Sequence, residues 1–319
     1  MPQLEEMTER LLGHTLSPLH SVAELRRRNR RRRHRRWVGV SASSAVAIAL
    51  LAFLVVLPGL GVTSNTASGT RLAAYITSAT QVSDQVLEEV GLPVDLNPPL
   101  PLSGQPALTD RGMPAVVYVG AEFCPFCAVA RWALVVALSK FGTFSNLGQA
   151  ISSSSSDVYP GLKSWSFHGS SYSSAYLVFD PAELASGASS PLGSLSPLQQ
   201  RVFSKYDHPP NTPSRATGAI PFIDVANRYL QIGASADPSV LEGLSLDQIA
   251  ADLHYPSSPV AQALDGSANY LIAALCSVVG QRAAPICASS TTVRAQAVLD
   301  GTAPTPITVP AATSSTDRP

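Results

Sequence analysis

Runs of apolar residues alternate along this chain with polar segments, and their lengths indicate what each segment forms. The first long run covers residues 38–62, none of which is charged. A helix of that length spans roughly 37 Å, which is enough to cross a hydrocarbon core of about 30 Å. We therefore expect a transmembrane helix over residues 37–62.

A short apolar run followed by a longer one begins the main domain. Residues 115–119 are rich in valine and predict a strand, whereas residues 125–140 predict a helix. This helix has Pro125 at its start and Gly142 just after its end, as helices prefer. Because apolar side chains cover most of its faces, we expect it to be buried. Residues 71–90 also have helical periodicity, ending at Gly91.

Later segments complete an alternation of strands and helices. Residues 143–170 are rich in serine and predict a loop. Beyond them the pattern predicts a strand over 174–179, two strands within 218–234 joined by a turn at 226–228, and helices over 198–206, 246–253 and 260–279. We interpret 114–290 as one α/β domain, 63–113 as a juxtamembrane helix with a proline-rich connector, and 291–319 as a largely disordered tail.

The charge distribution suggests which side of a membrane each part occupies. The net charge is zero, yet residues 26–36 hold nine of the 22 basic side chains, directly before the apolar span. The positive-inside rule then makes residues 1–36 a cytoplasmic tail and places the later chain outside. A nucleic-acid-binding segment is the alternative for the basic run, but the apolar span beside it favours a membrane, so we expect the lipid bilayer as a partner and no nucleic acid.

Two alternatives to a membrane anchor exist for the apolar span. A cleaved signal peptide usually has a short leader and an apolar core of about 7–15 residues, whereas here residues 1–36 precede a longer span. A buried core helix would lie next to the run of arginines, which is an unfavourable neighbour. An uncleaved anchor is therefore the preferred interpretation.

Cys124 and Cys127 are the most informative pair of side chains, because they stand at the predicted start of a helix. Unpaired N–H groups and the helix dipole stabilise a thiolate there, and the thiolate is the attacking species in disulfide exchange. Cys124 would attack a substrate disulfide, and Cys127, one turn later, would attack the resulting mixed disulfide. Half of a zinc site, a permanently closed disulfide and a Cu(I) site remain alternatives.

The other two cysteines, Cys276 and Cys287, do not complete a zinc spacing. We favour a structural disulfide, worth roughly 2–3 kcal/mol for so short a loop, over a second redox pair or two free thiols. His168, His208 and His254 have no metal-binding spacing either. We therefore expect no metal and no cofactor.

The segment from Gly120 to Cys127 (Gly-Ala-Glu-Phe-Cys-Pro-Phe-Cys) resembles the active site of the thioredoxin superfamily, and Ile220-Pro221 with the following hairpin resembles the second half of that fold. The resemblance implies a cis bond at Pro221, which would lie beside the cysteines and expose backbone to an extended substrate. It assigns substrate positioning to Pro221, Ile220, Phe123 and Phe126. The implied fold class is α/β and thioredoxin-like, with an insertion at about 142–215 between the CxxC helix and the cis-proline strand, preceded by one transmembrane helix.

A longer set of segments, 120–139, 167–174 and 220–229, is similar to the family catalogued as domain of unknown function 929. Its members are prokaryotic membrane-anchored proteins with a thioredoxin-like core, and the resemblance covers about 75–290. One departure from thioredoxins is that their buried acid, six residues before the first cysteine, is replaced by Tyr118. Glu122 is nearer to the cysteines, but we expect it to be more exposed.

These patterns lead to a functional hypothesis with one rival. The chain would be a membrane-anchored, extracytoplasmic thiol–disulfide oxidoreductase, acting as an oxidase or isomerase on exported proteins with thiols or disulfides. Electrons would pass to a redox partner in the membrane. The rival is a non-catalytic, membrane-anchored thioredoxin-like module that binds a partner or handles a metal.

Overall fold

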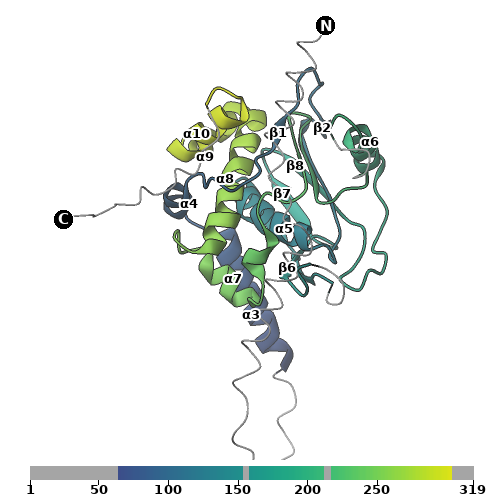
Figure 1. The fold of residues 1–319 in the computed structure, drawn as a ribbon, viewed down its shortest axis with the longest axis vertical. Coiled ribbons are helices and arrows are strands. Elements are labelled where there is room, and N and C mark those ends of the chain that lie inside the picture. Colours follow the sequence, from purple (N-terminus) through teal and green to yellow (C-terminus); the bar gives the residue numbers. More distant parts are fainter. Residues whose placement is uncertain (1–63, 154–157, 212–216, 304–319) are drawn as a thin grey trace, which may run out of the picture. The chain divides into compact units, whose positions relative to one another are not determined.

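The computed structural model describes residues 64–153, 158–211 and 217–303 (Figure 1). Both the basic tail over 1–36 and the apolar span predicted at 37–62 lie outside the described residues. Within those residues, six strands form the main sheet, in the order β1-β10-β9-β3-β2, and β8 also pairs with β3. Their bounds are β1 Leu100–Pro101, β2 Thr109–Asp110, β3 Met113–Gly120, β8 Val178–Glu183, β9 Phe222–Val225 and β10 Tyr229–Ile232.

Strand β3 is the centre of this sheet, and both of its faces are buried. It pairs in parallel with β8 and antiparallel with β9. Because side chains alternate along a strand, Val116 and Tyr118 face the larger hydrophobic core, whereas Val117 and Val119 face a smaller one. Helices α5 (Pro125–Ser139) and α8 (Pro259–Val279) pack on each other in the larger core, and α6 (Pro197–Tyr206) packs in the smaller one.

The remaining helices precede β1 or follow β10 in the sequence. The predicted helix over 71–90 is two helices, because Ser83 accepts a hydrogen bond from the Val86 N–H and caps a new start. The predicted tail over 291–319 begins with a helix that packs on α8. The bounds are α3 Ser64–Thr80, α4 Asp84–Val90, η2 Pro238–Leu241, α7 Leu246–Asp252, η3 Gly280–Ala283, α9 Ala284–Cys287 and α10 Ser290–Leu299.

The serine-rich segment over 143–170 is not simply a loop, as its composition suggested. Its described residues supply β5 (Gly148–Ile151) and β6 (Lys163–Ser166), which form a small antiparallel sheet, and most of β4 (Gly142–Ser145), which pairs antiparallel with β7 (Ser171–Ser174) just after the segment. A few large apolar side chains, including Phe144 and Trp165, anchor these strands in the core. The serines between them also bond to the main chain; Ser164 Oγ donates to the Ala128 carbonyl at 2.8 Å.

The predicted fold class, a thioredoxin-like fold with an insertion and a preceding transmembrane helix, is wrong as it was stated. The structure is a mixed α/β arrangement of a sheet and helices. Strand β8 lies inside the segment predicted as an insertion, 142–215, yet it is the parallel partner of the central strand. No helix of the described ranges has both the length and the apolar character needed to cross a membrane.

Candidate active site

Cys124 and Cys127 are held by the connection from β3 to α5. Cys124 is the N-cap of α5, and its sulfur accepts a hydrogen bond from the Cys127 N–H at 3.2 Å. Gly120 ends β3, and any Cβ on it would overlap the Tyr118 hydroxyl, so the close approach of strand and ring requires glycine. Both cysteines are free thiols in this structure.

The two thiols differ in how easily they ionise. The hydrogen bond from the Cys127 side chain lowers the pKa of Cys124, and backbone N–H groups of Cys127 and Phe126 and the charge of Arg131 act in the same direction. Burial raises the pKa of Cys127, and its hydrogen bond to Cys124 adds to that rise. The geometry therefore favours Cys124 as the thiolate and Cys127 as the thiol.

The residues expected to position a substrate come from two segments, the active-site turn and the residues just before β9. The thiol of Cys124 lies 3.8 Å from the Ile220 carbonyl oxygen, to which it can donate, and the Ile220–Pro221 bond is cis. Phe126, two residues after Cys124, is 42% exposed and its ring meets Tyr159 edge-on. Phe123 is half-buried in the turn before Cys124, where its carbonyl accepts from the Ser153 N–H at 2.9 Å.

A buried ion pair lies behind the cysteines and was not recognised from the sequence. Arg131, one turn beyond Cys127 on α5, places its Nη1 3.2 Å from Oε2 of Glu183, and both side chains are 0% exposed. Burial opposes the charge of Arg131, but the Glu183 carboxylate raises its pKa overall. Burial also raises the pKa of Glu183, against the effect of Arg131. A signal for Arg131 exists in the sequence, since it is the only charge in the apolar run over 125–139.

Tyr118 and Glu122 occupy different positions around that pair. The Tyr118 hydroxyl accepts from Arg131 Nη1 at 3.4 Å, and burial raises its pKa well above the ordinary value. Glu122 is half-buried and accepts from Ser166 Oγ at 2.5 Å and from the Gly187 N–H at 3.3 Å. The buried carboxyl group nearest to this cluster is therefore Glu183, which comes from β8.

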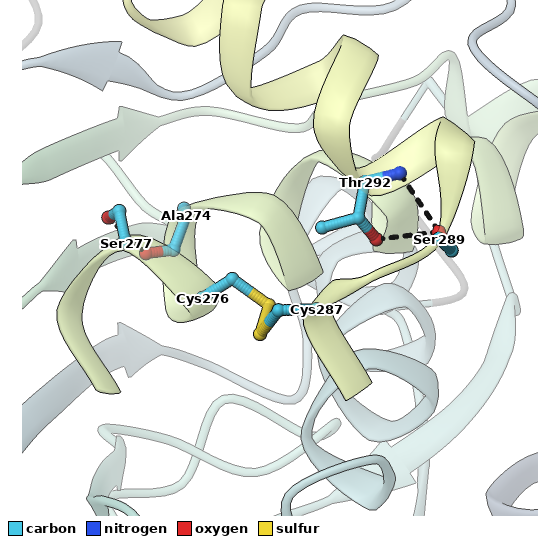
Figure 2. The surroundings of a disulfide bond; sticks show 6 residues. All are labelled: Ala274, Cys276, Ser277, Cys287, Ser289 and Thr292. Atoms are coloured by element: carbon cyan, nitrogen blue, oxygen red, sulfur yellow. Dashed lines mark hydrogen bonds between the residues drawn. A yellow bond between two sulfur atoms is a disulfide. The ribbon is translucent and has the colours of Figure 1, made fainter. Parts of the chain in front are cut away.

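Cys276 and Cys287 form a disulfide that links α8 to α9 (Figure 2). It is followed at once by Ser289, whose hydroxyl accepts from the Thr292 N–H at 3.0 Å and caps α10. The bond closes a short loop, with a sequence separation of 11. Among the described residues, no three His, Cys, Asp or Glu side chains are grouped as metal ligands would be.

Removing this disulfide should weaken the fold and leave thiol exchange intact. In Cys276→Ala/Cys287→Ala the unfolded chain gains freedom, so the free energy of unfolding should fall by roughly 2–3 kcal/mol. Urea denaturation measures this change, and exchange assays at a temperature where the variant is folded provide the control. A loss of exchange in the folded variant would instead make this pair a redox relay.

Comparison with known proteins agrees with the family that the sequence resembles. A family model described as "Domain of unknown function (DUF929)" matches residues 102–277, which include Cys124, Cys127 and Pro221. The predicted family is thus confirmed. No curated protein and no solved structure matches the chain.

Proposed function

We propose that this chain, which belongs to the DUF929 family, is a thiol–disulfide oxidoreductase with Cys124 as nucleophile and Cys127 as resolving cysteine. One observation carries the proposal. The Cys124 sulfur caps α5 by accepting from the Cys127 N–H, and the same sulfur faces the Ile220 carbonyl. A capped sulfur is stabilised as the thiolate, and once the thiol has ionised the Ile220 carbonyl beside it can accept a hydrogen bond from the backbone of a substrate.

The chemistry balances in either direction. In one direction the Cys124 thiolate attacks a client disulfide, forming a mixed disulfide and releasing one client thiolate. The Cys127 sulfur then attacks Cys124, the mixed disulfide breaks, and the second client sulfur leaves with the electron pair. The client is reduced and the cysteine pair is oxidised. The reverse sequence oxidises a client and returns both cysteines to thiols.

The surroundings of Cys124 favour a polypeptide as the client. Phe126 and Tyr159 offer an apolar contact beside the nucleophile, as an incompletely folded chain requires. The Ile220 carbonyl offers a hydrogen-bond acceptor for an extended backbone. The extracytoplasmic location, the exported identity of the clients and a membrane redox partner stay predictions from the sequence.

Serine variants of the two cysteines should give opposite results with a model protein that contains disulfides. Cys127→Ser keeps the nucleophile but cannot resolve, so a mixed disulfide between Cys124 and the client should accumulate. Cys124→Ser should form no such adduct and should lose exchange activity. Non-reducing electrophoresis followed by mass spectrometry of the linked peptides measures both outcomes.

The parent chain and Cys276→Ala/Cys287→Ala serve as controls, because both retain the active-site pair. Both should exchange disulfides without a lasting adduct. If Cys124→Ser is as active as the parent and Cys127→Ser gives no adduct, the chain is a binding module rather than an oxidoreductase.

A further inference from the structure

We propose that Arg131 is a positioning residue that supplies the counter-charge for Cys127 during resolution, and that Glu183 holds Arg131 in place. This inference rests on the proposed function and adds to it a part of the protein that touches no substrate. It follows from where the two charges lie: Arg131 is on α5 one turn beyond Cys127, and Glu183 ends the strand next to β3, opposite Gly120.

Arg131 is tied to the turn that carries the cysteines. Its Nη1 donates to the Ala121 carbonyl at 3.1 Å, and its Nη2 lies 3.5 Å from the Glu122 carbonyl. Its Nε lies 3.4 Å from Ser164 Oγ. These contacts fix the guanidinium beneath the turn, one helical turn from Cys127, which is also fully buried. A charge in so dry a place acts strongly on an ionising neighbour.

Glu183 is placed by strand pairing. It ends β8 in parallel register with Gly120, the last residue of β3, so its side chain reaches the base of the active-site turn. The chain after Glu183 also bonds to that turn, since the Leu184 N–H donates to the Gly120 carbonyl and the Glu122 N–H donates to the Ala185 carbonyl, both at 2.8 Å. Arg131 Nη1 lies within 3.3 Å of both carboxylate oxygens of Glu183.

A positive charge near Cys127 is useful because the Cys127 sulfur must briefly carry a negative charge although it is fully buried. When Cys127 attacks, its thiol loses a proton, the bond between Cys124 and the client sulfur breaks, and a bond between Cys124 and Cys127 forms. The departing client sulfur takes up a proton, so the overall charge is unchanged. In the reverse direction Cys127 leaves as the thiolate. Arg131 stabilises the charged sulfur in both directions; burial keeps the pKa of Cys127 raised, and the charge of Arg131 opposes that rise.

One reagent separates the two steps in the reduced full-length chain. Cys124 attacks dithiobis(nitrobenzoate) and releases one coloured thiolate, and Cys127 then resolves the adduct and releases a second. The first phase of colour reports on Cys124 and the second on Cys127. Cys127→Ser should show the first phase alone, which identifies the phases.

Two variants should shift the pH profile of the second phase in opposite directions. Arg131→Met/Glu183→Gln removes both charges and should slow the second phase about tenfold at neutral pH, moving its profile to higher pH. Glu183→Gln removes the opposing charge but keeps an acceptor for the guanidinium, which the Ala121 and Glu122 carbonyls also hold, and should move the profile to lower pH. Loss of packing would slow both variants alike, so opposite shifts indicate charge. Arg111→Met, at an exposed arginine, is the control and should match the parent.

The outcomes distinguish this inference from the proposed function. If the parent shows both phases and the second-phase profiles of the two variants coincide with it, or if both move to higher pH, the counter-charge is refuted while the exchange chemistry stands. If the double variant does not fold, Glu183→Gln decides alone, and an unchanged or raised profile refutes the inference. If the parent lacks the second phase, the proposed function itself fails.

Discussion

Replacing Arg131 by methionine alone should lower the free energy of unfolding by about 3–5 kcal/mol, because the Glu183 carboxyl group would remain buried without its partner. The double variant Arg131→Met/Glu183→Leu should cost much less than the sum of the single variants, since it leaves no unpaired charge. Urea denaturation of the four chains gives the coupling between the two side chains as a double-mutant cycle.

The exposed pair Arg111–Asp110 is the matched control for that cycle. These side chains are 73% and 40% exposed, so solvent screens their interaction and Arg111→Met should change stability little. A single Arg131→Met variant as stable as Arg111→Met would show that the buried pair does not hold the active-site turn.

The second large effect concerns the hydrogen bond between the two thiols. The Cys127 side chain is the main cause of the lowered pKa of Cys124. Cys127→Ala removes this donor and should raise the pKa of Cys124. At a pH below that pKa less of the thiolate is present, so the alkylation of Cys124 should slow about tenfold. Cys127→Ser keeps a hydroxyl donor of similar size and should stay near the parent.

This comparison separates the side chain from the backbone. Both variants retain the start of the helix and the backbone N–H of residue 127, so the helix dipole lowers the pKa of Cys124 equally in each. Equal alkylation rates in Cys127→Ala and the parent would mean that the backbone alone sets the reactivity of Cys124. Mass spectrometry of peptides labelled with iodoacetamide gives the rates residue by residue.

Local signals in the sequence were sufficient for the helix that begins after Cys124. Pro125 at the helix start and Gly142 after its end predicted a helix over 125–140, and α5 covers Pro125–Ser139. The hairpin was equally local, because a turn was predicted at 226–228 and β9 and β10 lie on either side of it. The helix and the hairpin could be predicted because residues adjacent in the sequence specify each of them.

Pairings between distant segments could not be predicted in this way. The parallel register of β3 with β8 places Glu183 opposite Gly120, and no local pattern encodes it. The small strands β4 and β6 depend on apolar anchors such as Phe144 and Trp165, which the serine-rich composition around them hides. For the same reason the cysteine pair could be found from its spacing, whereas the acid behind it could be found only in the structure.

The proposed exchange depends most on the ionisation of Cys124, and the pH dependence of Cys124 alkylation in the reduced full-length chain measures this ionisation directly. We expect Cys124 to react as a thiolate at a pH where an ordinary cysteine is still protonated, and at a much lower pH than Cys127. If Cys124 reacts no faster than Cys127, or only at the pH where a free cysteine ionises, Cys124 is not the nucleophile that the proposed exchange requires.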